Sequence, residues 1–423
     1  MKSILTALLC IFTLAVSAQP NTIQQIVKGR NNSKHQQQKP YVILISADGF
    51  RYDYARKYQA KHLLALSSAG VSAASMQPSF PSITFPNHYT LVTGLYPAHH
   101  GLVSNKFYAP QLHRNYNYKS ATVIEGLWYG GTPLWVLAEQ QQMLSASFYW
   151  VGSEAPVKGV LPTYYYHYNE QINIHDRIEA VKAWLQLPAA KRPHLITIYF
   201  PEVDHAGHKY GPESKETARQ VHFIDSAVNE LVKAVNQTKL KVNYIFVSDH
   251  GMITVSNKNA LQLPSVIDTN KFVVSGDAAL VELYAKKADA RTINNTYNAL
   301  LSKAKRKGYN VYLKSNMPAY LHYGEKDDWH HHIGDILLVP RFPYTFQLGK
   351  GKVNPGFHGY DPRAVKAMGA TFYAWGPAFK KHLKIPSFEN VNVYPVITRI
   401  LGLRYTDRID GTMKVADEVL MSK

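Results

Sequence analysis

Residue types that bind metal ions follow three apolar runs of the sequence. Asp48 comes after the first run, Asp204 and His208 after the second, and the adjacent pair Asp249 and His250 after the third. Carboxylate oxygens and neutral imidazole nitrogens are ligands that Zn²⁺ accepts. A single Asp at the end of a strand is more often a helix cap or a turn residue. A metal site is therefore indicated by the recurrence of Asp and His after three runs and not by any one of these residues.

A later loop adds one more histidine to this set. His358 lies between two glycines, where a surface turn is the alternative interpretation. Asp204 and His208 are four residues apart, so either a helical turn or a tight loop would bring them together, and Gly207 favours the loop. The full set has three carboxylates and three imidazoles: Asp48, Asp204, His208, Asp249, His250 and His358. That is the ligand supply of a pair of zinc ions.

A candidate nucleophile lies in the segment 78–94. Pro86 is favoured in the first turn of a helix and Gly94 at its end, which places Thr84 at the helix N-terminus. There the helix dipole and the free N–H groups favour an alkoxide or a bound phosphate. An ordinary N-cap threonine is the alternative interpretation of Thr84.

These residues need a scaffold that places strand ends side by side. Almost continuous apolar runs predict strands buried on both faces: 41–46, 195–200, 243–248 and 336–339. Apolar residues at 3–4 spacing predict helices between them: 178–187 and 216–236. The alternation predicts an α/β fold with a largely parallel central sheet flanked by helices. In such a sheet, ligands bind beyond the carboxyl ends of the strands.

Composition narrows the class of partner. The 423 residues are 46% hydrophobic, which excludes a disordered chain, and 47 Lys+Arg against 29 Asp+Glu give a net charge of +18. A basic balance favours anionic partners, but the basic residues are scattered. Nucleotides, nucleic acid and an acidic membrane surface are such partners, but scattered charge predicts no dedicated nucleic-acid surface. The oligomeric state stays open, with a monomer favoured.

The first residues predict export. Lys2, an apolar stretch over 4–16 and the small residues of Val16–Ala18 are typical of a signal peptide spanning residues 1–18. The stretch is short for a membrane span. Cys10 lies inside it, so the mature chain would contain neither a disulfide nor a thiolate metal site. We expect a periplasmic or secreted protein; a lipidated Cys10 is disfavoured because Leu9, before it, is not small. Polar residues 19–40 predict a mobile tether.

The order of these residues resembles one family. The pattern of Asp48, Thr84-Phe-Pro-Asn-His, Asn105, Asp204-x-x-x-His208, Asp249-His250-Gly and His358-Gly-Tyr-Asp361 resembles the nucleotide pyrophosphatase/phosphodiesterase family of the alkaline phosphatase superfamily. Three further segments match it: Trp128–Trp135, Ile333–Asp335 and Phe388–Val391. The chain departs from the family at His205, which occupies a spacer position, and in the run His330–His332. The disulfides of animal members are absent.

The resemblance implies an alkaline-phosphatase-like core over 41–423, with residues 261–349 inserted as a cap region. It also implies two zinc ions, one held by Asp48, Thr84, Asp249 and His250, the other by Asp204, His208 and His358. Thr84 would form a covalent threonyl intermediate, and water would then release the product. The resemblance also implies a small nucleotide or phosphodiester substrate. Nucleoside triphosphates would give the monophosphate and pyrophosphate.

Other roles also rest on the resemblance. The Thr84 N–H and the Asn105 side chain would bind a phosphate oxygen. Phe85 and Tyr199 would clamp a nucleobase, although both are also plausible core aromatics. Asp361 would orient a ligand histidine from outside the metal sphere. The run His330–His332 is either an extra metal site or, preferably, a solvated loop.

Four other functions are alternatives to a nucleotide phosphodiesterase. A sulfatase needs a formylglycine precursor followed by Pro and Arg, and this chain lacks that motif. A phosphomonoesterase of the alkaline phosphatase type needs an added Arg or Mg²⁺ site, and neither is apparent in the sequence. A lysophospholipid or choline-phosphodiester hydrolase is a closer rival, since aromatics also box a choline cation. A non-catalytic metal- or nucleic-acid-binding protein is disfavoured by the poised nucleophile.

Overall fold

A nine-stranded sheet runs through the main body of the computed structural model, which describes residues 22–287, 289–349 and 351–422. In spatial order the strands are β1 (Gln25–Ile26), β8 (Tyr164–Tyr165), β7 (Ser145–Phe148), β9 (Leu195–Phe200), β2 (Tyr41–Ala47), β10 (Val242–Val247), β19 (Phe372–Trp375), β3 (Val71–Ala73) and β20 (Leu383–Ile385). Only β1 and β19 run against the other strands of this sheet. The predicted α/β class with a largely parallel central sheet is confirmed.

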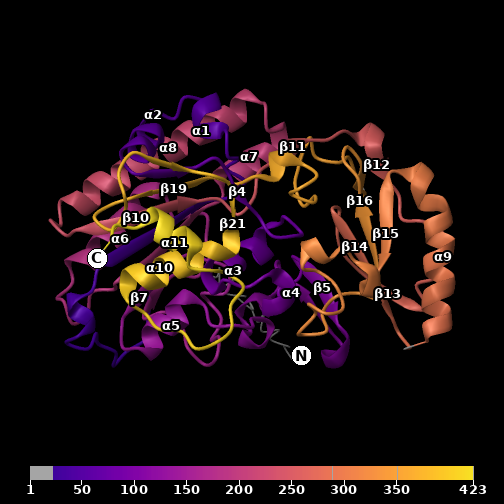
Figure 1. Ribbon diagram of the computed structural model, residues 1–423, viewed down its shortest axis with the longest axis horizontal. Coiled ribbons are helices and arrows are strands. Elements are labelled where there is room, and N and C mark those ends of the chain that lie inside the picture. Colours follow the sequence, from indigo (N-terminus) through magenta and orange to yellow (C-terminus); the bar gives the residue numbers. More distant parts are fainter. Residues whose placement is uncertain (1–21, 288, 350, 423) are drawn as a thin grey trace, which may run out of the picture.

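Helices cover both faces of this sheet (Figure 1). One face packs on α1 (Tyr54–Lys57), α2 (Lys61–Ala69), α6 (Ile174–Gln186) and α8 (Lys215–Asn236). The other packs on α3 (Thr84–Thr93), α4 (Pro97–His100), α5 (Leu134–Gln140), α10 (Val393–Leu401) and α11 (Lys414–Val419). Alternate residues of β2 enter opposite cores: Leu44 lies in one, and Ile43 and Ile45 lie in the other. Burial on both faces explains why the run is continuously apolar.

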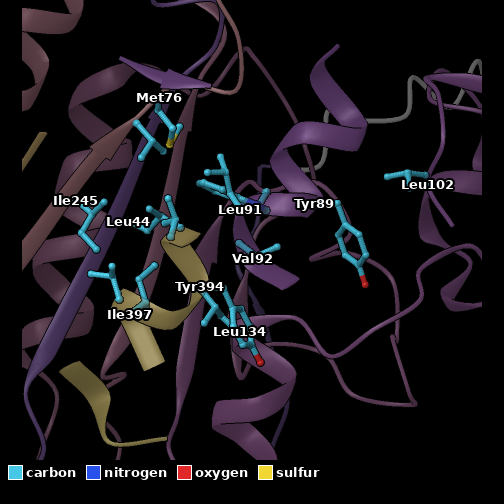
Figure 2. Close-up of a cluster of buried hydrophobic side chains, with 14 of the residues drawn as sticks. Leu44, Met76, Tyr89, Leu91, Val92, Leu102, Leu134, Ile245, Tyr394 and Ile397 are labelled. Atoms are coloured by element: carbon cyan, nitrogen blue, oxygen red, sulfur yellow. The ribbon is translucent and has the colours of Figure 1, made fainter. Parts of the chain in front are cut away.

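Helix α3 is anchored deep in one of these cores. Figure 2 shows its residues Leu91 and Val92 in one cluster with Leu44 of the sheet and with Tyr394 and Ile397 from α10. All five side chains are at most 1% exposed. Because protein cores are close-packed, this burial fixes the position of the first turn of α3, where Thr84 lies.

A second, smaller sheet lies to one side of the main body (Figure 1). Its antiparallel strands are, in order, β13 (Phe272–Asp277), β14 (Leu280–Ala285), β16 (Ile336–Pro340) and β15 (Tyr309–Leu313), and α9 (Ala290–Lys307) covers it. The strands β12 (Ala260–Leu261) and β17 (Thr345–Phe346) pair where the chain enters and leaves this region.

The run 336–339 was expected among the parallel strands, and the structure corrects this. It forms β16, which pairs antiparallel with β14 and β15. Leu337 packs into the core of the main body, while Ile336 and Leu338 pack under α9. The strand is thus buried on both faces without being parallel, and a continuous apolar run reports only the burial.

The described part of the expected mobile tether, residues 22–40, is instead held against the main body. Gln25 and Ile26 pair with β8. Asn32 is buried, donates to the carbonyl oxygens of residues 189 and 192 at 2.9 and 2.6 Å, and accepts from the Leu144 amide at 2.7 Å. Polar side chains here satisfy main-chain groups, which composition does not reveal. The predicted signal peptide, residues 1–18 with Cys10, lies outside the described residues.

Short strand pairs fix the loops that carry the candidate site. They are β4 (Met76–Gln77) with β21 (Phe388–Glu389), β5 (Lys106–Ala109) with β6 (Arg114–Asn117), and β11 (Ile253–Thr254) with β18 (Gly356–Phe357). The third pair joins the loop after His250 to the loop before His358. Across the described part of the chain, no helix is both long and apolar enough to cross a membrane.

Candidate active site

Three adjacent parallel strands bring the first carboxylates together. In the order β9, β2, β10, the strands end next to one another, and the chain then delivers Asp204, Asp48 and Asp249. The Nε2 atom of His250 lies 3.0 Å from Asp249 Oδ2 and 3.5 Å from Asp48 Oδ1. Asp48, Asp249 and His250 are at most 1% exposed. They form the first donor cluster.

Asp204 and His208 lie on a helix, α7 (Glu202–Tyr210), and not in the loop that Gly207 suggested. A Cβ atom at Gly207 would come within 3.1 Å of the Met252 side chain. The glycine therefore serves close packing against the loop that follows His250, and the helix tolerates it. One helical turn places Asp204 Oδ1 3.5 Å from His208 Nε2.

The second donor cluster forms where His358 meets α7. The Nε2 atom of His358 lies 3.0 Å from His208 Nε2 and 3.7 Å from Asp204 Oδ1. Its ring also stacks on that of His250, with centroids 3.6 Å apart. His250 belongs to both donor groups, with Asp48 and Asp249 in one and with Asp204 and His358 in the other. His208 joins them through its contacts with Asp204 and His358, so all six residues predicted as metal ligands lie in one place.

The three histidines leave the same ring nitrogen free. Each Nδ1 faces a main-chain carbonyl oxygen: His208 that of Gly356 at 2.9 Å, His250 that of Gly251 at 2.9 Å, and His358 that of Ser82 at 3.0 Å. A carbonyl oxygen can only accept, so Nδ1 carries the proton, and in the neutral ring Nε2 then carries a lone pair. The 3.0 Å between the Nε2 atoms of His208 and His358 is then unfavourable unless a cation lies between them.

The carboxylates show the same need for positive charge. Each keeps a buried oxygen atom without a hydrogen bond: Asp48 Oδ1, Asp204 Oδ1 and Asp249 Oδ2. Burial, and then the charges of Asp249 and Asp204, raise the pKa of Asp48 well above its usual range. Burial also acts to raise the pKa of Asp249, but His250 and His88 outweigh it and hold that pKa well below the usual range. Unpaired buried carboxylate oxygens and free imidazole nitrogens fit divalent cations.

Thr84 is placed at this centre by the start of α3. The preceding residue, Ile83, is extended and has no side-chain group that could cap the helix. The Thr84 N–H and the positive end of the helix dipole are therefore available to an anion. The Oγ1 atom of Thr84 lies 3.2 Å from His250 Nε2, beside the first cluster.

Asn105 lies beside the same helical turn. Its Oδ1 atom accepts a hydrogen bond from the Phe85 N–H at 3.0 Å. This bond fixes the plane of the side-chain amide and leaves its NH₂ group to donate elsewhere. The side-chain amide is thereby held at the first turn of α3, which begins with Thr84.

The two aromatic residues expected to hold a base have different surroundings. Phe85 is half-buried and packs edge-to-face on Tyr118, with centroids 5.4 Å apart. The Tyr199 hydroxyl donates to Asp48 Oδ2 at 2.6 Å, so this residue positions a candidate metal ligand. The ring beside it, Tyr168, is 45% exposed, with its centroid 6.1 Å from that of Tyr199. Tyr168 lies in a Tyr-rich loop whose spacing gave no signal.

Asp361 does not orient a ligand histidine. Its carboxylate accepts from the Tyr320 hydroxyl and from the Arg363 amide, both at 2.8 Å. The Nδ1 of His358 is already satisfied by a carbonyl oxygen. Gly359 adopts a φ of 104°, which only glycine reaches readily, and the chain turns there. The expected role of Asp361 is therefore replaced by a contact with the smaller-sheet region.

Two polar residues of the nucleophile segment were not singled out from the sequence. The buried His88 has Nε2 2.8 Å from Ser46 Oγ and Nδ1 3.3 Å from Asp249 Oδ2. Asn87 is also buried, and its amide donates to the carbonyl oxygens of Pro81 and Ile83 at 2.8 and 2.9 Å. The only signal for them is their place in the motif that follows Thr84.

The histidine run packs against α4. His330 and His332 face the carbonyl oxygens of His99 and Gly101, at 3.1 and 2.6 Å. His332 is buried, so the run is not a solvated loop as a whole. In the part of the chain that the structure describes, the metal-type clusters are the two at the candidate site.

Comparison with known proteins places the chain among phosphodiesterases. The profile of the family described as type I phosphodiesterase / nucleotide pyrophosphatase matches residues 42–361. Ectonucleotide pyrophosphatase/phosphodiesterase family member 1 of Rattus norvegicus is 35% identical over 379 residues, covering 86% of this chain and 41% of that protein. Venom phosphodiesterase 2 of Crotalus adamanteus is 33% identical over 372 residues, covering 86% and 45%. The chain thus spans about two fifths of the length of these curated relatives.

Solved structures agree with the sequence comparison. Murine ectonucleotide pyrophosphatase / phosphodiesterase 5 superposes with a TM-score of 0.83 and 28% identity, covering 91% of this chain and all of that one. An inactive variant of the same murine protein, solved in complex with AMP, gives a TM-score of 0.82, covering 90% of this chain and all of that one. The fold is shared along almost the whole chain.

Proposed function

Because the chain belongs to the type I phosphodiesterase / nucleotide pyrophosphatase family, with its alkaline-phosphatase-like fold, we propose that it hydrolyses phosphodiester or phosphoanhydride bonds of nucleotides. One observation supports this most directly. The Thr84 hydroxyl begins a helix and lies 3.2 Å from His250, beside two abutting clusters of metal-type side chains. A nucleophile, a helix N-terminus and a dense set of ligands at one point are the components of phosphoryl transfer.

The donor set fits two zinc ions. Asp48, Asp249 and His250, together with Thr84, would hold one; Asp204, His208 and His358 would hold the other. Nitrogen and carboxylate donors without a thiolate suit zinc. Bound zinc would lower the pKa of a coordinated hydroxyl and offset charge on the phosphoryl group.

Thr84 supplies the nucleophile in this proposal. Its hydroxyl loses a proton as its oxygen bonds to phosphorus, and the bond from phosphorus to the leaving oxygen breaks on the opposite side. The product alcohol or pyrophosphate takes up a proton, and the threonyl phosphodiester remains on the chain. Water then attacks phosphorus from the face that the leaving group vacated, which restores the hydroxyl.

The neighbours of Thr84 hold the substrate. The Thr84 N–H and the NH₂ group of Asn105 bind a non-bridging phosphate oxygen. Phe85 and Tyr199 flank the organic group, and we add Tyr168 because its ring is the most exposed near Asp48. If these rings hold a nucleoside, Thr84 attacks the phosphorus nearest the ribose, and ATP yields AMP and pyrophosphate. We also propose residues 261–349 as a cap region of one catalytic domain.

Export is proposed from the sequence pattern of residues 1–18. It predicts a mature N-terminus at Gln19 in the periplasm or the medium. N-terminal sequencing of protein recovered from those fractions tests it, and an intact Met1 or a lipidated Cys10 would contradict it.

Turnover of two chromogenic diesters tests the substrate class. p-Nitrophenyl-TMP carries a nucleoside, and p-nitrophenylphosphorylcholine carries a quaternary amine on the same leaving group. We expect much higher kcat/KM for the first. The reverse preference would favour a choline-phosphodiester hydrolase, and no turnover of either would favour a binding protein. Release of ADP and orthophosphate from ATP would contradict attack at the α-phosphorus.

A further inference from the structure

An exposed tyrosine near the candidate centre is held by its neighbours on the surface. The hydroxyl of Tyr168 donates to Glu170 Oε1 at 2.9 Å, and its amide donates to Glu154 Oε1 at 2.9 Å. The Tyr149 ring packs against the same ring, with centroids 5.1 Å apart. Tyr168 is 45% exposed, yet it is held both at its main-chain amide and at its hydroxyl group.

The second oxygen of Glu170 reaches the helix of the metal ligands. Glu170 Oε2 lies 3.5 Å from Nδ1 of His205, on α7. His205 directly follows Asp204 and departs from the family pattern at that position. On the other side, the Tyr168 ring lies next to Tyr199, whose hydroxyl bonds to Asp48. A chain of contacts thus begins at Asp48 and passes through Tyr199 to Tyr168. It continues through Glu170 to His205, the residue next to Asp204.

This pair contributes little to the stability of the fold. The side chains of Glu170 and His205 are 48% and 54% exposed, and solvent-exposed pairs of this kind contribute almost nothing to unfolding free energy. What the pair does restrict is the orientation of Tyr168. A preordered aromatic wall loses less entropy when a ring stacks on it.

We propose that Glu170 and His205 act as a latch that holds Tyr168 in place as the wall for a ring-bearing group on the phosphate. They are positioning residues, and they bias the enzyme towards nucleoside esters over small alkyl esters. This inference rests on the proposed phosphodiesterase function, and it goes beyond that function by assigning selectivity to two residues that touch neither the metal ligands nor the reacting atoms.

Two substrates that share a leaving group separate the latch from the chemistry. p-Nitrophenyl-TMP has a base to stack, whereas methyl p-nitrophenyl phosphate has none. Tyr168→Ala should raise KM for the first about 5- to 150-fold, the range for one lost stacking partner. Glu170→Ala and Tyr168→Phe should each raise it about 2- to 10-fold, the range for one lost hydrogen bond. His205→Ala, which removes only the contact with Glu170, should raise it in the same direction. The KM for the methyl ester should change much less.

A double variant and a matched control complete the test. Tyr168→Phe and Glu170→Ala delete the same hydrogen bond, so their effects on KM should not multiply when combined. Glu179→Ala removes a comparable exposed contact, with Lys182 on α6, and should leave both substrates unaffected. Equal changes for both substrates, multiplying effects, or unchanged KM in the single variants would each overturn the latch. Continued turnover of the methyl ester would show that the proposed phosphodiesterase function survives such a result.

Discussion

In each candidate ligand histidine, a contact with the main chain fixes which ring nitrogen can bind a metal ion. Nδ1 of His208, His250 and His358 faces a carbonyl oxygen, which leaves Nε2 as the only donor atom. Burial, and then the charges of His250 and His208, lower the pKa of His358 well below its usual range. That ring is neutral and ready to coordinate at neutral pH. Preset tautomers reduce the reorganisation that metal binding requires.

Metal removal is the direct prediction at this scale. Dialysis against a chelator should abolish hydrolysis of p-nitrophenyl-TMP, and added zinc should restore it, because the buried carboxylates and imidazoles then regain their counter-charge. Elemental analysis should find close to two zinc ions per chain in active protein. Active protein with less than one zinc per chain would contradict the two-metal proposal.

Substitution of Thr84 tests the covalent step. Thr84→Ala should reduce kcat by several orders of magnitude, because the hydroxyl forms the bond to phosphorus, and Thr84→Ser should retain part of the rate. Circular dichroism and the unfolding midpoint should stay near those of the parent protein, since the side chain is only half-buried. Near-normal turnover by Thr84→Ala would rule out the threonyl intermediate.

Asn105 is expected to act on the rate through the charged phosphoryl oxygens. Asn105→Ala should lower kcat about 10²- to 10³-fold, the usual cost of one such donor. Steady-state kinetics would check this. Asn105→Asp is a matched variant that keeps an acceptor for the Phe85 amide but replaces the NH₂ donor with a negative charge, so it should be at least as slow. Full activity in Asn105→Asp would show that the residue only supports the helix.

At the scale of elements, α3 and the loop before it are joined by a pair of buried amides. Asn87 Oδ1 accepts from the Ser79 amide at 2.8 Å and from Asn390 Nδ2 at 2.9 Å, while its own NH₂ group donates to two carbonyl oxygens. Every hydrogen-bonding position of this side chain is thereby used. The loop that delivers Thr84 is fixed to the segment before α10.

Breaking this contact should cost both stability and rate. Asn87→Ala leaves several buried polar groups without partners, so the free energy of unfolding should fall by about 2–4 kcal/mol. Asn87→Asp keeps the shape but places a carboxylate oxygen against two carbonyl oxygens, and it should be no less damaging. Urea denaturation measures both variants, and a loss below about 0.5 kcal/mol in each would contradict the assigned role.

The sequence predicted the parts of the fold that leave a local pattern. The runs that became β2, β9 and β10 are apolar because both faces of the sheet are covered, and the ligands follow them directly. The prediction that the run forming β16 is a parallel strand was wrong, since burial on two faces does not encode strand direction. The helix around Gly207 and the packed segment 22–40 depend on tertiary contacts that no local signal reports.

The same reason explains which site residues were missed. The metal-type residues share a chemistry whose recurrence after successive apolar runs can be recognised along the chain. Tyr168 and His205 matter only through contacts with Glu170 and Tyr199, which come from other segments. The expected role of Asp361 depended on where the chain turns after His358, and that turn is set by Gly359.

For the molecule as a whole, Glu282 is a buried acid at the junction of the two sheets. Its Oε2 and Oε1 atoms lie 3.0 and 3.3 Å from the hydroxyl oxygens of Tyr284 and Tyr323, and the Tyr323 hydroxyl donates its proton to the carbonyl oxygen of Val103 in the main body. Val103 precedes Asn105 in the same loop. Burial raises the pKa of Glu282 from 4.5 to about 8. The smaller sheet is thus joined to the Asn105 loop through a carboxyl group that is mostly protonated at neutral pH.

Because the pKa of Glu282 is higher in the folded than in the unfolded chain, the folded state binds the extra proton between about pH 4.5 and 8. This contribution is complete below pH 4.5 and is lost as pH rises through 8, at up to about 1.4 kcal/mol per pH unit. Glu282→Gln keeps a neutral side chain of the same shape and cannot titrate. Urea denaturation at pH 5 and pH 8 should therefore show the variant gaining roughly 2–4 kcal/mol relative to the parent at the higher pH. A constant difference between the two proteins at both pH values would mean that Glu282 does not bind this proton.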